Sequence, residues 1–206
     1  MQYSQKVLDH FMKPHNVGKL ENPDASATEG SPACGDQVSI DMQVNPKTMV
    51  IEDIKFQSYG CASNIATGSI ITDMAKGLTI EEAKNITWKE AAEELDGLPP
   101  VKMHCSVLAV DTLRKAILNF EIKNGMAEKE KFSKKLLVEE LKKVLYPEVG
   151  EDLVTLKMVK YVGFENGVAI VDVDIPKFDK YRDNVAEEIV EHLEQFEEVK
   201  EVKVTM

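Results

Sequence analysis

Three cysteines lie in the first half of this 206-residue chain, and the second half contains none. Two of them have another ligating side chain close by: Asp36 lies two residues after Cys34, and His104 directly precedes Cys105. The third cysteine is Cys61. Thiolates and imidazoles bind Zn(II) and iron–sulfur units, whereas a carboxylate is a harder and more readily exchanged ligand. These residue types favour a soft-metal site built from the five side chains.

The spacing of the cysteines leaves a second interpretation open. No two of them form a CxxC pair, and an isolated cysteine is often only a small buried hydrophobe. Their predicted positions favour reactivity, since Cys34 falls in a loop, Cys61 at a strand-to-helix hinge and Cys105 at a helix start, where the helix dipole stabilises a thiolate. The other histidines are expected on solvated surfaces: His10, His15 and His192.

Composition excludes several classes of protein. The net charge is −11, with 25 basic and 36 acidic residues, and neither half is basic, which argues against a nucleic-acid-binding protein. No apolar run approaches the roughly 18 residues that span a bilayer, so no membrane association is expected. The first residues lack the apolar core of a signal peptide, and an odd number of cysteines argues against a disulfide framework. We therefore expect reduced thiols in the cytoplasm.

The cysteines of the first half are predicted to follow strands and precede helices. Apolar and polar residues alternate over 37–44, which indicates a half-buried strand, and 49–56 is its predicted hairpin partner. A third short strand is expected at 57–59, just before Cys61. Residues 14–32 are rich in Pro, Gly and Asn and are predicted to be irregular.

Helices are predicted around these strands. The first covers residues 3–12 and the second 62–76. Two short helices begin with capping boxes at Thr79 and Thr87, each with a glutamate three residues later. Residues 98–102 are expected to be extended, because each proline disfavours the α conformation in the residue before it. A long helix then runs from His104 to near Gly125.

The second half is predicted to be a separate α+β domain. A charged linker covers 126–131, so the domain boundaries are placed at 1–126 and 127–206. Asn166-Gly167 is a strong hairpin signal between two of the strands. The expected elements form an α-β-β-α-β order: helix 132–145, strands 154–163 and 168–175, helix 179–196 and strand 198–205.

Five sequence motifs occur in a fixed order along residues 3–118. They are Tyr3-Ser4-x-Lys6-Val7-x-Asp9-His10, Pro14-x-Asn16-Val17-Gly18, Ala33-Cys34-Gly35-Asp36, Tyr59-Gly60-Cys61 and Leu98-Pro99-Pro100-Val101-Lys102-x-His104-Cys105-Ser106. This series resembles the IscU/NifU N-terminal family of iron–sulfur cluster scaffold proteins. The resemblance implies a three-stranded antiparallel sheet covered on one face by helices. One departure is His15, where the family commonly has arginine.

The resemblance also implies the roles of the candidate residues. Cys34, Cys61 and Cys105 are the implied cluster ligands, with Asp36 or His104 as the fourth, and these five residues are equally the implied ligands of iron or zinc. Lys102 matches a lysine that neighbours the site. Cys105 is the expected first acceptor of sulfur, because a helix-start thiolate beside an imidazole is a good nucleophile.

The implied function is that of a scaffold and carrier, not an enzyme. Such a protein assembles a [2Fe–2S] cluster from iron and from sulfur supplied by a cysteine desulfurase, and transfers it to apo-proteins. The 98–102 segment matches one that an Hsp70-type chaperone grips in some members. Whether the cluster lies within one chain or bridges a homodimer stays open. The alternative is a zinc-binding sulfur-transfer protein, and zinc is also expected in preparations that lack iron.

The second half is similar to the PaaD-like domain of iron–sulfur maturation proteins. The similarity rests on Leu145-Tyr146-Pro147-Glu148-Val149-Gly150 and on the α-β-β-α-β order. Because this half contains no cysteine, we expect it to bind no cluster through thiolates and to act as a docking or dimerising module.

Overall fold

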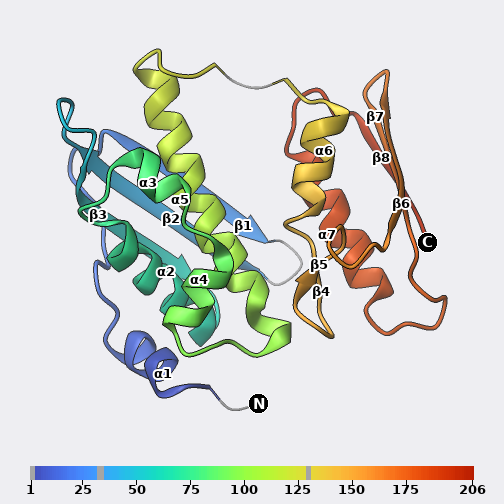
Figure 1. Ribbon diagram of the computed structural model, residues 1–206, viewed down its shortest axis with the longest axis horizontal. Coiled ribbons are helices and arrows are strands. Elements are labelled where there is room, and N and C mark those ends of the chain that lie inside the picture. Colours follow the sequence, from blue (N-terminus) through green and yellow to red (C-terminus); the bar gives the residue numbers. More distant parts are fainter. Residues whose placement is uncertain (1–2, 32–34, 129–130) are drawn as a thin grey trace. The chain divides into compact units, whose positions relative to one another are not determined.

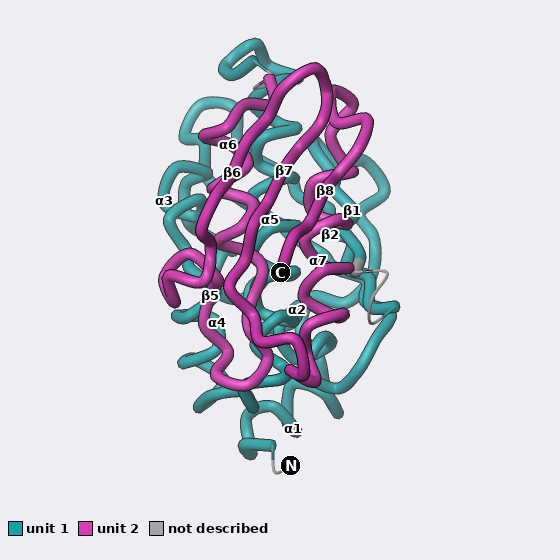
Figure 2. The backbone as a smooth tube through the Cα atoms, turned by 90° about the vertical axis from the view of Figure 1, so that its right-hand side faces the viewer, with its two compact units in different colours: residues 1–129 teal, residues 130–206 magenta. Residues whose placement is uncertain are grey.

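The structure is a computed structural model that describes residues 3–31, 35–128 and 131–206. The chain divides into two compact units, residues 1–129 and 130–206 (Figure 2). Each unit combines helices with a small sheet, so the predicted α+β class is confirmed.

The sheet of the first unit contains three antiparallel strands in the order β1-β2-β3. They are β1 (Ala25–Ser31), β2 (Asp36–Val44) and β3 (Ile51–Tyr59). The predicted alternation in β2 is confirmed, because Val38, Ile40 and Met42 are fully buried and point to one face. Ile40 pairs with Phe56 of β3, as expected of a hairpin.

The prediction for the third strand was wrong. Residues 57–59 are the end of β3, and the third strand is β1, inside the segment that was expected to be irregular. Its residues are small and polar and carry little β-propensity, so its pairing with β2 decides the conformation. Ala25 and Ala27 are buried there, and Asn119 Nδ2 donates to the Ser26 carbonyl at 2.9 Å.

Among the described residues of the first unit five α-helices accompany the sheet, and Figure 1 shows α2 and α5 on the same face of it. The helices are α1 (Gln5–Met12), α2 (Ala62–Ala75), α3 (Ile80–Lys84), α4 (Trp88–Glu94) and α5 (Met103–Lys123). Both predicted capping boxes are confirmed, because Thr79 and Thr87 each accept a hydrogen bond from a backbone amide three residues on, at 3.2 Å.

The proline segment before α5 is less extended than predicted. Pro100–Lys102 forms one turn of 3-10 helix, and the Lys102 amide donates to the Pro99 carbonyl at 2.7 Å. Proline is tolerated in a first helical turn because the amide proton that it lacks would have no helical partner there. The turn leads directly into α5 and so fixes the direction in which His104 and Cys105 leave it.

The core of the first unit lies between the sheet and helices α2 and α5. α5 packs on β1 and β2, and α2 packs on β3. α2 is buried on nearly every side, because α1, α4 and α5 also contact it. The largest fully buried side chains of this core are Ile40, Met42, Ile51, Ile54, Phe56, Ile71, Leu113 and Ile117.

The second unit has the predicted α-β-β-α-β order with one addition. Its elements are α6 (Lys134–Leu141), β4 (Leu145–Tyr146), β5 (Glu151–Asp152), β6 (Val159–Glu165), β7 (Val168–Val173), α7 (Arg182–Glu194) and β8 (Glu201–Thr205). The added β4–β5 pair is only two residues long. The predicted strand at 154–163 begins only at Val159, because residues 153–157 form turns.

The main sheet of the second unit has the order β6-β7-β8. β6 and β7 are antiparallel and join at Asn166-Gly167, where both residues have positive φ, so the predicted hairpin is confirmed. β7 and β8 run parallel, connected through α7. His192 on α7 is half-buried and shares a hydrogen bond with Glu140 Oε2 at 3.4 Å.

We expect Gly68→Ala to destabilise the first unit. A Cβ at this position of α2 would lie 2.5 Å from two carbons of the Phe56 ring, and Phe56 is 1% exposed and cannot easily move. The free energy of unfolding should fall by about 1–3 kcal/mol, the usual cost of overpacking. Urea unfolding followed through the single tryptophan, Trp88, measures this unit specifically.

The matched control is the double variant Phe56→Leu/Gly68→Ala. Leucine occupies less space above position 68, so adding the alanine should cost less stability in this background than in the wild type. Equal stability of Gly68→Ala and the wild type would contradict the close packing of α2 on β3.

Candidate metal centre

Three segments of the first unit meet at the candidate site. Asp36 is the first residue of β2, and Cys61 is the N-cap residue of α2, directly after β3. His104 and Cys105 lie in the first turn of α5. The buried hydroxyl of Thr67 on α2 donates to the Cys105 carbonyl at 3.1 Å and so ties the two helices together at this point.

The ligating atoms of these residues lie close together. One donor atom from each of Asp36, His104 and Cys105 lies within 4.8 Å of the others. The Cys105 Sγ atom lies 3.8 Å from Asp36 Oδ2, 3.5 Å from His104 Nε2 and 3.8 Å from Cys61 Sγ. The structure thus brings four of the predicted ligands together, and Cys34 lies outside the described residues.

The distance between the two sulfur atoms excludes a disulfide and fits both a hydrogen bond between them and a shared metal ion. The S–S bond of a disulfide is about 2.05 Å long. Two thiolates on one tetrahedral Zn(II) with bonds of about 2.3 Å lie roughly 3.8 Å apart. The separation of 3.8 Å between Cys61 Sγ and Cys105 Sγ equals the second value.

Gly60 allows the Asp36 carboxylate to approach α2. A Cβ at position 60 would lie 2.5 Å from Asp36 Oδ1 and 2.7 Å from Asn64 Nδ2. Any other residue here would therefore displace the carboxylate or the amide. The sequence identified Gly60 only as a hinge after β3, because its contact with Asp36 joins positions 24 residues apart.

Asn64 is a site residue that the sequence analysis missed. Its side chain is fully buried, and its Nδ2 donates to Ser58 Oγ at 3.0 Å. Within the described part of the chain, Asn64 Oδ1 and the buried Ser63 Oγ have no hydrogen-bond partner. Two adjacent polar residues in the first turn of a buried helix were the signal that could have revealed them.

The two described thiols differ in exposure and in pKa. Cys61 is half-buried, whereas Cys105 is fully buried. A hydrogen bond from Cys105, followed by one from the Asn64 backbone amide, lowers the pKa of Cys61 to about 5. The same bond to Cys61, together with burial and the nearby Asp36, raises the pKa of Cys105. Without metal the pair therefore holds one thiolate, on Cys61, and one thiol, on Cys105.

Lys102 supplies positive charge beside these acidic groups. Partial burial lowers its pKa, but the surrounding acidic groups, first among them Cys61, outweigh burial and raise the pKa above its ordinary value. Lys102 therefore stays protonated and offsets part of the negative charge that gathers at the helix ends.

Comparison with known proteins identifies the family to which the first unit is similar. Residues 2–127 match the family described as "NifU-like N terminal domain", which is more than half of the chain. The chain belongs to the IscU/NifU N-terminal family. Residues 136–205 match a second family model, described as "Iron-sulfur cluster assembly protein".

Relatives of this family cover the first unit. The "Iron-sulfur cluster assembly scaffold protein IscU 1" of Archaeoglobus fulgidus is 56% identical over 129 residues, which is 63% of this chain and 83% of the relative. The protein IscU of Escherichia coli K12 is 45% identical over 126 residues, 60% of this chain and 97% of the relative. A solved structure of a NifU-like protein from Brucella abortus is 22% identical, with a TM-score of 0.48, and covers 58% of this chain and 94% of that one.

The described helices were compared with what a membrane-spanning helix requires. Among residues 3–31, 35–128 and 131–206, no helix combines the length and apolar character that crossing a bilayer requires.

We expect iodoacetamide to alkylate Cys61 far faster than Cys105 in the metal-free protein. The lowered pKa means that the reactive thiolate of Cys61 is present above about pH 5 and is lost as the pH falls through that value. Peptide mapping by mass spectrometry across a pH series gives the rate at each cysteine.

The Cys105→Ala variant is the control for this pH profile. It removes the hydrogen-bond donor, so the midpoint for Cys61 should rise toward the ordinary thiol value of about 8.5. A wild-type midpoint near that ordinary value would contradict the shared proton.

Proposed function

We propose that this protein is a scaffold on which a [2Fe–2S] cluster is assembled and from which it is transferred to apo-proteins. The single observation that carries the proposal is the convergence of Asp36, His104 and Cys105 within 4.8 Å, with Cys61 Sγ 3.8 Å from Cys105 Sγ. The names of the relatives support the same role. A carrier of this kind is not an enzyme, because the cluster is its cargo.

The proposed ligands are three thiolates and one weaker group. A [2Fe–2S] cluster ordinarily takes four protein ligands, two for each iron. Cys34, Cys61 and Cys105 supply three, so Asp36 or His104 has to supply the fourth. Both lie within 4 Å of Cys105 Sγ. A carboxylate oxygen binds a soft centre less strongly than a thiolate does, which suits a cluster that must later leave.

Cys105 is the proposed first acceptor of sulfur from a cysteine desulfurase. Its thiolate would attack the outer sulfur of the desulfurase persulfide, and the desulfurase cysteine would leave as a thiolate, with no net oxidation. Because Cys105 is fully buried and its pKa is raised, this step requires the docked desulfurase to open the site and the thiol to lose its proton. Cys61 is the more exposed thiol and the competing acceptor.

The remaining partners are proposed from the arrangement of the chain. The proline turn at 98–102 is half-buried or exposed, and an Hsp70-type chaperone that grips it would pull directly on the start of α5. The second unit is proposed to dock acceptor proteins or a second copy of the chain. A reducing compartment, the cytoplasm, would keep the thiols available.

A zinc-binding sulfur-transfer protein is the second candidate function. It is favoured by one observation, the separation of 3.8 Å between Cys61 Sγ and Cys105 Sγ, which suits a single tetrahedral Zn(II). Zn(II) would hold the thiolates deprotonated and ready to accept sulfur. The two functions use the same residues and differ in whether iron and sulfide build a cluster on them.

Anaerobic reconstitution with ferrous iron, cysteine, a cysteine desulfurase and dithiothreitol, the reductant that converts persulfide sulfur to sulfide, tests the proposal. We expect the wild-type protein to gain the visible absorption of a [2Fe–2S] cluster together with equal amounts of bound iron and sulfide. Cys61→Ser should lose this absorption, because a serine hydroxyl does not replace a terminal thiolate ligand of the iron at neutral pH.

Circular dichroism of the metal-free Cys61→Ser protein is the control for folding. Retention of zinc with no cluster absorption in the wild type would favour the sulfur-transfer function. A full cluster spectrum in Cys61→Ser would exclude Cys61 as a ligand.

The Asp36→Ala variant tests the exchangeable ligand. We expect its cluster to persist longer and to transfer to an apo-ferredoxin at least several-fold more slowly, because removing the carboxylate removes the readily displaced ligand. The rate of appearance of holo-ferredoxin measures transfer. Unchanged transfer kinetics would contradict the role of Asp36.

A further inference from the structure

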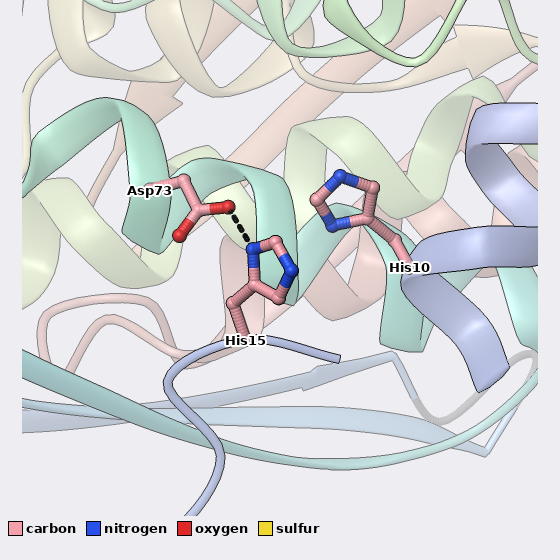
Figure 3. A group of neighbouring side chains, drawn as sticks. All are labelled: His10, His15 and Asp73. Atoms are coloured by element: carbon pink, nitrogen blue, oxygen red, sulfur yellow. Dashed lines mark hydrogen bonds and ion pairs between the residues drawn. The ribbon is translucent and has the colours of Figure 1, made fainter. Parts of the chain in front are cut away.

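A second group of ligating side chains lies in the first unit, remote from Cys61 and Cys105. It combines His10 at the end of α1, His15 in the following loop and Asp73 on α2 (Figure 3). One donor atom from each lies within 4.8 Å of the other two. The sequence analysis placed both histidines on solvated surfaces, but His10 is half-buried and its ring centroid lies 4.9 Å from that of His15.

Hydrogen bonds from neighbouring residues hold these three side chains in place. His10 Nδ1 shares a hydrogen bond with the buried Ser69 Oγ at 2.8 Å, and the His15 backbone amide donates to the same oxygen at 2.8 Å. Asn16 Nδ2 donates to Asp73 Oδ1 at 2.9 Å and so orients the carboxylate. His15 Nδ1 lies 2.6 Å from Asp73 Oδ2.

We propose that His10, His15 and Asp73 form a second site, which binds a divalent first-row transition-metal ion such as Zn²⁺ or Fe²⁺. Two imidazoles and one carboxylate are a ligand set that these ions take, with the remaining coordination positions filled by water. Ligands with bonds of about 2.1 Å around a tetrahedral ion lie roughly 3.4 Å apart. His15 Nδ1 and Asp73 Oδ2, which lie 2.6 Å apart, would therefore have to separate slightly while the His10 ring moves closer to them. The exposed side chains of His15 and Asp73 can rotate to allow this.

Outer hydrogen bonds of the kind present here are what such a site requires. A ligating imidazole is ordinarily oriented by a hydrogen bond through its other ring nitrogen, and a ligating carboxylate is itself hydrogen-bonded. The Ser69 hydroxyl bonds the His10 ring and the His15 backbone amide, and the Asn16 side chain donates to Asp73. His10 and His15 also line a surface hollow of about 350 Å³ together with Asp9, Met12 and Lys13, which gives a hydrated ion access.

The second site is distinct from the cysteine site. Each site includes a residue of α2 or its N-cap position. Cys61 occupies the N-cap position, and Asp73 lies twelve residues further along the helix. At 1.5 Å per residue these positions are roughly 18 Å apart, so one ion cannot contact both sets. With three protein ligands and open positions for water, the second site would exchange its ion more readily than a site closed by four thiolates.

Position 15 offers a matched variant for the test. His15→Arg removes a ligand, because a guanidinium stays protonated and does not bind a cation, yet it can keep an ion pair with Asp73. The loop after α1 should therefore stay in place. Asp73→Asn is the second variant, which keeps the shape of the side chain and removes its charge.

The experiment is equilibrium dialysis of the full-length protein against Zn²⁺. Two versions are compared, the wild type and a triple variant, Cys34→Ser/Cys61→Ser/Cys105→Ser, in which the thiolate site is silenced. We expect His15→Arg to lose one bound Zn²⁺ per chain in both versions, and Asp73→Asn to weaken the same binding at least tenfold. Zn²⁺ should also shift the imidazole proton resonances of His10 and His15 in the triple variant, with His192 as the unshifted reference.

The outcomes separate this site from the scaffold function. Two results would overturn the proposal: the same number of bound Zn²⁺ ions in the wild type and His15→Arg, or His10 and His15 resonances that Zn²⁺ does not shift. Either would show that His10, His15 and Asp73 only hold α1 against α2. Cluster reconstitution in His15→Arg with the wild-type yield confirms that the cysteine site is intact. A loss of one bound Zn²⁺ per chain in the His15→Arg variant supports the second site even if the cysteines hold no iron–sulfur cluster.

Discussion

The close packing of α2 between β3 and α5 is the constraint on which the candidate site depends. Gly68 leaves room for the Phe56 ring, so the helix can lie directly on the sheet. The Thr67 hydroxyl donates to the Cys105 carbonyl at 3.1 Å and fixes the position of the first turn of α5 relative to α2. A change in either contact would move the start of α2 relative to the start of α5, and with them Cys61 and Cys105.

Bringing these groups together has an electrostatic cost. The Asp36 carboxylate and the Cys61 thiolate converge beside the buried Cys105 thiol, and like charges repel strongly where water is largely excluded. The metal-free protein lowers this cost in two ways. Cys61 and Cys105 share one proton, which depresses the pKa of the first and raises that of the second, and Lys102 stays protonated nearby. A bound cation or cluster would remove the repulsion directly, so the same residues that destabilise the empty site favour its cargo.

Much of the local structure follows from the sequence. The alternation in β2, the capping boxes at Thr79 and Thr87 and the Asn166-Gly167 hairpin were predicted correctly, because each is decided by side chains within a few residues of one another. The β1 strand was missed because its alanines and serines carry no strand signal of their own. Its conformation comes from pairing with β2 and from the cover that α5 provides, and neither contact is local.

The sequence by itself determined which residues could bind metal and roughly where the helices that present Cys61 and Cys105 begin, since residue chemistry and the breaks at Gly60 and Pro99-Pro100 are local properties. Only the tertiary structure decided which of those residues meet. Asp36, Cys61 and Cys105 are separated by 25 to 69 positions, and the packing of two helices on one sheet joins them. The same holds for Asp73, which belongs with His10 and His15 only because α1 folds back onto α2. Contacts of this kind depend on how whole elements pack, and short sequence patterns do not encode them.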